Sequence, residues 1–262
     1  MFQLDAYKLK WIAIIGMILN HMVFAWQAIL PMPLMFVLYA PGGLTFPILA
    51  YFVVEGYRHT SNLGRYILRL LIFGVISIPF HFLVFGSFGL NILFTIALSL
   101  LALLMYDKIK IRFLFWLAFV VLIVASAIFM FDWFIIGPIV VLLYHIIPNE
   151  NARRIVPPIV AGVFMLGLTL FSMAGLALMQ ATPGMEADAA ALIASFGDME
   201  LMTAALTFII GCFTAAFLLK GFNGERGKRM KWLFYAFYPL HLIFLAAVAL
   251  ALGLTDLGAF GL

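Results

Sequence analysis

Nine long apolar segments run through this chain, and they constrain its fold more than any other feature. A helix that crosses a bilayer needs about 20 mostly apolar residues. The segments that approach this length, two of them short, are 11–30, 43–57, 66–86, 90–106, 113–131, 133–147, 156–179, 201–219 and 232–253. The stretch 31–43 is apolar but broken by proline and glycine, so we expect an interfacial or re-entrant piece there.

The composition excludes a water-soluble fold. Hydrophobic residues make up 66% of the chain and charged residues 10%, whereas soluble domains carry about 45–50% apolar and about 25% charged residues. The longest connection, 180–200, is too short to fold alone, and no signal-peptide cleavage site follows the first segment. We therefore predict one all-α domain over residues 1–262: a polytopic transmembrane helical bundle of nine spans, located in the cell membrane (inner or plasma membrane).

The basic residues indicate how this bundle lies in the bilayer. Positive charge in short loops marks the cytoplasmic side of a membrane protein. If the N-terminus is inside and nine spans alternate, all 15 Lys and Arg residues fall inside, and the acidic 180–200 loop falls outside. We therefore predict that the N-terminus is inside and the C-terminus outside. This sorting also explains the net charge of +4, so no nucleic-acid partner is expected.

Two histidines lie within expected spans, where ionisable side chains are costly and mark functional sites. His21 comes eleven positions after Lys10, about 16 Å above that cytoplasmic anchor at a rise of about 1.5 Å per residue. His241 comes ten positions after Lys231, about 15 Å deep by the same rise. Both imidazoles should therefore lie near the middle of a hydrocarbon core that is about 30 Å thick.

Polar neighbours accompany both histidines. Asn20 adjoins His21, and Tyr238 precedes His241 by three residues on the same helical face. Structural alternatives stay open for each imidazole. His21 has the alternative of a hydrogen bond that packs two helices, and His241 that of a bond to a carbonyl freed by the proline of Tyr-Pro-Leu-His.

A second polar cluster follows the second apolar segment. Glu55 lies one turn from Arg58 and His59, while Arg65 and Arg69 share one face of the third segment. Three arginines at one cytoplasmic mouth exceed what topology requires, and a guanidinium binds phosphate through a planar fork of donors. The cluster predicts a docking site for a phosphorylated cofactor. The alternative is a set of topology-setting residues with one Glu–Arg pair.

A third group lies on the expected outer side. His81 and Asn91 flank the turn between the third and fourth segments, and Asp132 lies in the next outer turn. These side chains either border an outer opening or are hydrated interfacial residues, and Asp132 has the further alternative of a carboxylate that favours a helix N-terminus. The sequence offers no set of three well-spaced zinc ligands, so no metal is expected, and the single Cys212 excludes an intrachain disulfide.

Several motifs, in order along the chain, resemble the TraX family, membrane proteins associated with acetylation of conjugative pilin. The matching pieces are Leu9–Met17 with Asn20-His21, Gly43–Pro47, Glu55–Thr60, Tyr66–Leu70, Pro79-Phe80, Asn91–Thr95, Lys231-Trp232 and Phe234–His241. The family usually reads Asp-His where this chain has Asn20-His21, so an acidic partner for the imidazole either comes from elsewhere, with Glu55 as one option, or is dispensable. Lys10 and His21 also resemble a wider superfamily of membrane acyltransferases, in which ten residues separate a basic residue from a histidine in the first span.

The resemblance implies a membrane-bound acyltransferase that uses acetyl-CoA or another short acyl-CoA from the cytoplasm. The anionic 3′-phospho-ADP part of CoA would dock at Arg58, Arg65 and Arg69, with Lys10 and His59 beside them. The acceptor implied is an amine or hydroxyl on a peptide, glycan or lipid reached from the other side, with a peptide N-terminus among the options.

The same resemblance and the midplane depth together suggest roles in the transfer. His21 would deprotonate the acceptor or carry the acyl group itself. Asn20 or Tyr238 would donate to the tetrahedral oxyanion, and Glu55 and His241 complete the predicted catalytic set. The water-poor interior would limit hydrolysis of the thioester.

Two other classes of function compete with this hypothesis. One is a proton-coupled transporter or flippase that uses His21, Glu55 and His241 as a relay, and a discontinuous helix at Pro41-Gly42-Gly43 would suit it. No internal repeat supports that class, and nine spans do not divide into equal halves. The other is a membrane-embedded assembly protein without catalysis.

Overall fold

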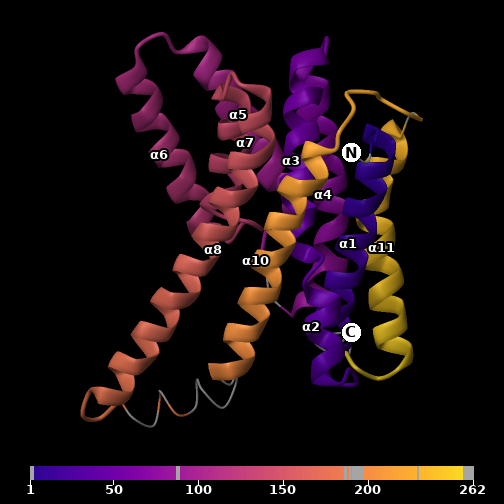
Figure 1. Ribbon diagram of the computed structural model, residues 1–262. Helices are drawn as coiled ribbons and strands as arrows, with labels where there is room; N and C mark the ends of the chain where they lie inside the picture. The colour runs from indigo at the N-terminus through magenta and orange to yellow at the C-terminus, as the bar shows by residue number, and fades with distance from the viewer. Residues whose placement is uncertain are drawn as a thin grey trace.

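The computed structural model describes residues 3–86, 89–185, 188, 190, 198–228 and 230–255, and all regular structure among them is helical (Figure 1). The helices are α1 (Ala6–Trp26), α2 (Met32–Tyr39), α3 (Gly42–His59), α4 (Leu63–Phe85), α5 (Ile92–Lys108), α6 (Arg112–Ile128), α7 (Ile136–Ile146), α8 (Glu150–Ala181), α10 (Asp198–Lys220) and α11 (Lys231–Ala251). The predicted all-α fold is confirmed.

Six helical stretches are long and apolar enough to cross a membrane: α1, α2 with α3, α4, α8, α10 and α11. The protein is therefore a multi-pass membrane protein. Helices α5 and α6 have 17 residues each and α7 has 11, so they are shorter than the six helical stretches that can cross the membrane. All nine predicted segments coincide with helices, but the count of nine crossings stays a prediction.

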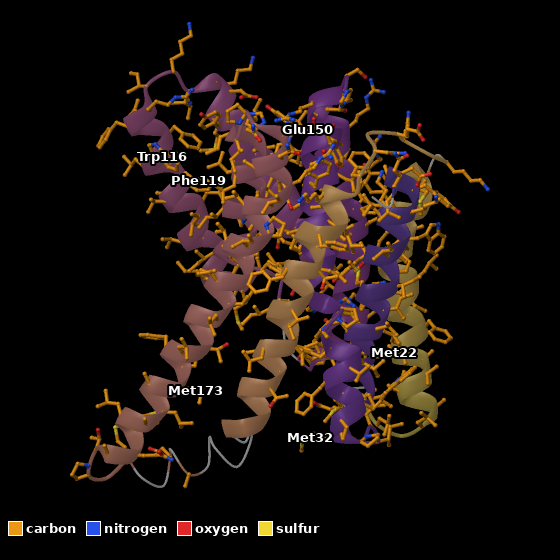
Figure 2. All side chains as sticks on the ribbon, in the orientation of Figure 1. Met22, Met32, Trp116, Phe119, Glu150 and Met173 are labelled. Carbon is orange, nitrogen blue, oxygen red and sulfur yellow. The ribbon has the colours of Figure 1, made fainter. Side chains whose placement is uncertain are left out.

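The outer flank of the bundle is apolar, as expected of a surface that faces lipid. Trp116 on α6 stands on that flank (Figure 2), and Phe171 on α8 is 77% exposed. The interior is built around α3, which packs against α1, α7 and α10 and contributes a nearly continuous run of buried residues. Helix α11 packs against α4 and α1 on the other side.

The stretch expected to be broken contains a short helix followed by a sharp junction. Helix α2 begins behind Pro31 and ends at Tyr39, and α3 begins at Gly42. The side-chain amide of Asn20 donates to the carbonyl of Tyr39 at 3.2 Å. A Cβ on Gly42 would lie 2.3 Å from Nδ2 of Asn20, so only glycine allows this approach. The break between α2 and α3 is thus held by α1.

One end of the molecule collects most of the basic side chains. This basic end consists of the start of α1, the end of α3, the starts of α4 and α8, the α5–α6 turn and the α10–α11 connection (Figure 1). Its basic residues include Lys8, Lys10, Arg58, Arg65, Lys108, Lys110, Arg112, Arg153, Arg154, Lys220, Arg226 and Lys228. Glu186 of the acidic loop, Arg229 and the C-terminal Leu262 lie outside the described residues.

Candidate active site

The two histidines predicted to lie near the midplane, His21 and His241, form a direct hydrogen bond. Helices α1 and α11 pack side by side, and Nδ1 of His21 lies 2.8 Å from Nε2 of His241. Their rings stack with centroids 5.0 Å apart and an interplanar angle of 26°. The similar depth expected from the spacing to Lys10 and Lys231 therefore corresponds to a real contact between helices that are far apart in the sequence.

A backbone carbonyl assigns the proton positions in this pair. Nδ1 of His241 lies 3.0 Å from the carbonyl oxygen of Phe237, which accepts but cannot donate, so this nitrogen carries the hydrogen. In the neutral ring, Nε2 of His241 is then an acceptor, and Nδ1–H of His21 donates to it. Nε2 of His21 then keeps a lone pair that accepts no hydrogen bond from the described residues. His241 thus bonds a helix carbonyl as well as His21, but Phe237 is not the residue four positions before Pro239 whose carbonyl that proline would free.

Two further aromatic rings lie beside His21, which stays partly exposed. Phe85 of α4 contacts its ring edge-to-face at 5.0 Å, and Tyr238 of α11 does so at 6.4 Å. The Tyr238 hydroxyl is buried and makes no hydrogen bond of good geometry with the described residues. This hydroxyl is therefore available to donate a hydrogen bond beside the imidazole of His21. Asn20 is directed to the α2–α3 junction instead, where its amide is engaged.

A cavity of about 560 Å³ opens at the basic end, between α1, α3, α4 and α11. Its lining includes four basic side chains, those of Lys10, Arg69, Arg226 and Lys228. Two of these cations lie over aromatic rings: Nζ of Lys10 is 4.8 Å from the Phe52 ring, and the Arg69 guanidinium is 5.3 Å from the Tyr235 ring. His59 and the single acidic residue Glu55 also line the wall. The cavity is thus built for an anionic ligand.

A second, smaller cavity leads from the first toward the histidines. It has a volume of about 20 Å³, and it shares the wall residues Leu49, Ile96 and Phe234 with the large cavity. Its inner end is formed by Phe237 and Tyr238, the residues that contact His241. A small apolar cavity therefore lies between the basic cavity and two ring neighbours of His241.

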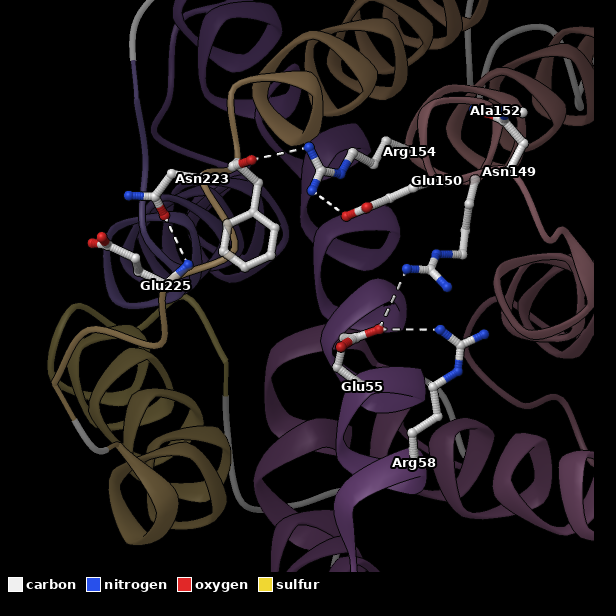
Figure 3. A network of polar contacts seen from close by, with 10 residues as sticks. Glu55, Arg58, Asn149, Glu150, Ala152, Arg154, Asn223 and Glu225 are labelled. Atoms are coloured by element: carbon white, nitrogen blue, oxygen red, sulfur yellow. Dashed lines mark hydrogen bonds and ion pairs between the residues drawn. The ribbon is translucent and has the colours of Figure 1, made fainter.

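The predicted cytoplasmic cluster divides between this cavity and an ion-pair network beside it. Arg58 donates to Oε1 of Glu55 at 3.3 Å, and Arg153 approaches the same carboxylate oxygen at 3.8 Å (Figure 3). Arg58 also donates to the carbonyl of His145 at 3.1 Å. Glu55 is therefore paired with arginines at the basic end, and the suggested pairing with His21 is not formed. Arg65 is exposed, one turn beyond Arg69, and does not line the cavity.

Two cavity residues were not singled out by the sequence. From sequence, Arg226 and Lys228 are expected only to mark the cytoplasmic side, because they lie in a basic loop. That loop folds back over the start of α1: Leu4 donates to the Gly221 carbonyl at 2.9 Å and Ala6 to the Glu225 carbonyl at 2.8 Å. This pairing of distant segments has no local sequence signal, so only the structure adds these two cations to the site.

The outer group also comes together in space. Nε2 of His81 lies 3.6 Å from the carboxylate of Asp132. Asn91 caps α5 and donates to the carbonyl of Gly74 at 2.9 Å. Asp132 does not cap the following helix, because α7 begins only at Ile136 and has no side-chain cap. Among the described residues, no three His, Cys, Asp or Glu side chains are grouped as metal ligands.

Comparisons with known proteins agree along almost the whole chain. A family model described as "TraX protein" matches residues 5–249. A probable fimbrial assembly protein FimC, serogroup H1, of Dichelobacter nodosus is 29% identical, and the alignment covers 95% of this chain and 97% of that protein. No solved structure matches the chain significantly.

Proposed function

The chain belongs to the TraX family, and from this premise we propose that it is an acyltransferase embedded in the inner or plasma membrane. It moves an acetyl or other short acyl group from cytoplasmic acyl-CoA to an amine or hydroxyl acceptor on the opposite side. The observation that carries this proposal is a cavity lined by four cations, with a small apolar cavity between it and a histidine pair in which Nε2 of His21 makes no hydrogen bond to the described residues. Each half suits one part of an acyl-CoA.

The large cavity would hold the nucleotide part of the donor. CoA carries its phosphates at one end, and Lys10, Arg69, Arg226 and Lys228 offer positive charge and donors for them. The Arg69 guanidinium has a buried Nε without a hydrogen bond to the described residues, so a donor there is still available. Of the remaining predicted docking residues, His59 stands in the wall, and Arg58 and Arg65 would contribute charge at the mouth.

The pantetheine arm would then extend toward the histidine layer along the small apolar cavity, which would have to widen to admit it. His21 lies about 16 Å beyond Lys10 by helix rise, a span that suits an extended arm. Leu49, Ile96 and Phe234 would exclude water around it. A dry passage limits loss of the acyl group to hydrolysis.

The chemistry proposed for His21 uses its free Nε2 as a general base. The acceptor nitrogen or oxygen attacks the thioester carbonyl carbon while Nε2 takes the proton of the acceptor. The Tyr238 hydroxyl donates to the oxyanion of the tetrahedral intermediate. The carbon–sulfur bond then breaks, the acyl group stays on the acceptor, and the CoA thiolate leaves and takes the proton from His21.

The direct test is release of CoA by the purified protein supplied with labelled acetyl-CoA. Because a curated relative is described as a fimbrial assembly protein, a fimbrial subunit peptide with a free amino terminus is the first acceptor to try, before glycan and lipid acceptors. Acceptor-dependent CoA release with label on the acceptor supports the proposal. If acetyl-CoA neither binds nor reacts, transport or a non-catalytic assembly role replaces it.

The proposed orientation predicts where reporters fused to the chain will lie. We propose nine crossings with the N-terminus in the cytoplasm, because the basic residues would then all face the cytoplasm. A reporter fused after Asn223 should be cytoplasmic, and one fused at Leu262 should be extracytoplasmic. Paired phosphatase and fluorescent-protein fusions measure this. A cytoplasmic reporter at Leu262 would overturn the count of nine.

The cavity also predicts that two neighbouring arginines differ in donor binding. Arg69 lines the cavity, whereas Arg65 is exposed one turn away and serves as a matched control. A hydrogen bond to a charged group contributes about 1.5–3 kcal/mol, so Arg69→Ala should raise the Kd for acetyl-CoA by about tenfold or more. Arg65→Ala should have a smaller effect. Calorimetry on detergent-solubilised protein measures both, and equal Kd values for the two variants would remove Arg69 from the donor site.

A further inference from the structure

A histidine and a carboxylate, His81 and Asp132, lie close together near His21 and have no part in the mechanism above. His81 of α4 is only 3% exposed, yet its Nε2 makes no hydrogen bond with the described residues. The nearest acidic group is the carboxylate of Asp132 at 3.6 Å, whose side chain remains 32% exposed. A buried polar group without a partner is unusual in a folded protein and calls for an explanation. A ligand that completes this pair would supply one.

The pair is adjacent to the proposed reaction centre. The Phe85 ring lies between the two imidazoles: it stacks on His81 at 4.4 Å and contacts His21 at 5.0 Å. The buried Tyr238 hydroxyl, which also neighbours His21, is within electrostatic reach of Asp132. Tyr238 therefore lies beside both His21 and Asp132, and the small apolar cavity reaches Tyr238 from the side of the basic cavity.

The backbone holds Asp132 in this place at a conformational cost. Met130 has a φ of 50° and Trp133 a φ of 56°, and they are the only non-glycine residues with positive φ in the described part of the chain. Hydrogen bonds fix the turn: Asp132 donates to the Leu90 carbonyl at 2.8 Å, and the Thr95 hydroxyl donates to the Asp132 carbonyl. Such conformations persist only where the surroundings enforce them, and they concentrate at functional sites.

The chemistry of these groups selects the kind of ligand that fits. A carboxylate only accepts hydrogen bonds, and Nε2 of His81 faces the carboxylate of Asp132. A phosphate or carboxylate of a ligand would be repelled here by Asp132. The complementary partner is a group that carries N–H or O–H. The two sides of His21 therefore differ in sign, with cations toward the basic cavity and a carboxylate toward the outer turn.

We propose that Asp132, positioned by His81, binds the N–H or O–H group of the acyl acceptor and aligns it with Nε2 of His21. This inference rests on the proposed acyltransferase function. An amine acceptor gives one N–H to Asp132, attacks the thioester carbon, and loses its other hydrogen to His21 as a proton. A sugar acceptor gives a neighbouring hydroxyl to Asp132, and its attacking hydroxyl loses the proton to His21. Asp132 thereby sets the affinity for the acceptor, whereas the basic cavity sets the affinity for the donor.

Two substitutions with a matched control test this assignment. Asp132→Asn and His81→Asn remove the charge and the positioning ring, and Asp107→Asn removes a carboxylate at the basic end that bonds Tyr57 and His145 instead. The acceptor KM should rise by about tenfold or more in Asp132→Asn, the expected effect of losing a charge-assisted hydrogen bond. The Kd for acetyl-CoA should stay unchanged, and Asp107→Asn should keep the acceptor KM of the unmodified protein. Asp132→Glu should restore part of the acceptor affinity.

A binding measurement separates this site from the proposed function. The probes are a short peptide with a free amino terminus, the same peptide with that terminus acetylated, and a soluble alkyl glycoside as the hydroxyl probe. Free-amine or glycoside binding that Asp132→Asn and His81→Asn both weaken supports the site even if no acyl transfer occurs, in which case only the enzymatic proposal fails. Binding and acceptor KM unchanged in either variant that still binds acetyl-CoA would overturn the assignment. So would loss of acetyl-CoA affinity together with acceptor affinity in both variants.

Discussion

Replacement of His21 by alanine is expected to reduce acyl transfer by about 10²–10⁴-fold, the usual contribution of a general base. The reason is geometric: the small apolar cavity ends at two ring neighbours of His241, the hydrogen-bond partner of His21, and Nε2 of His21 makes no hydrogen bond to the described residues. Donor docking depends on a cavity about three helical turns away, so acetyl-CoA binding should persist. Single-turnover release of labelled CoA, measured beside acetyl-CoA affinity, checks both expectations.

His21→Gln distinguishes chemistry from packing. Glutamine keeps the ability to donate a hydrogen bond to His241 but cannot take a proton near neutral pH or carry an acyl group. If glutamine restores activity, His21 is a packing residue and the proposed mechanism fails. If both variants are inactive yet bind acetyl-CoA, trapping of an acetylated imidazole in the unmodified protein then separates an acyl carrier from a general base.

The helices could be predicted because they depend on local sequence, and the depth of the histidines stays a prediction that uses the same local information. Each apolar segment is long enough to identify, and a regular rise of about 1.5 Å per residue converts spacing into depth. The predicted equality of depth for His21 and His241 needs only the two basic anchors. Their actual contact needs α1 and α11 to be neighbours, which the spacing within each helix does not determine.

The division of the cytoplasmic cluster shows where local patterns end. Arg65 and Arg69 share a helical face, as their spacing predicts, but the cavity extends only as far as the inner turn. Arg58 turns toward α7, where it donates to the His145 carbonyl. It also shares the Glu55 carboxylate of α3 with Arg153 of α8. Arg226 and Lys228 enter the cavity only because a loop more than 200 residues from the N-terminus bonds to Leu4 and Ala6.

Asp132 illustrates a different limit. From sequence, a carboxylate shortly before a helix suggests stabilisation of the helix N-terminus. The chain instead makes a strained turn between Met130 and Trp133, and α7 starts later. A turn enforced by tertiary hydrogen bonds to Leu90 and Thr95 has no periodic signal, so the proximity of Asp132 to His81 could not be predicted.

Replacement of His241 by phenylalanine is expected to lower kcat without changing acetyl-CoA affinity. The Phe237 carbonyl favours the Nδ1–H tautomer of His241. Nε2 of His241 then accepts a hydrogen bond from Nδ1–H of His21, which favours the same tautomer there. Without Nε2 of His241 as acceptor, nothing favours the Nδ1–H tautomer of His21, and a hydrogen on Nδ1 of His21 loses its partner. Loss of such a bond costs about 1–3 kcal/mol, which corresponds to roughly tenfold to a hundredfold in rate.

His241→Gln is the matched variant, because its side-chain oxygen still offers an acceptor to His21. Partial recovery of kcat in glutamine but not in phenylalanine indicates that His241 positions His21 and does not merely fill space. Nitrogen chemical shifts of a selectively labelled His21 should report the Nδ1–H tautomer in the unmodified protein and in His241→Gln, and a mixed tautomer in His241→Phe. If both variants lose activity and acetyl-CoA binding equally, His241 holds α11 against α1 structurally, and the free nitrogen of His21 must be maintained by another group.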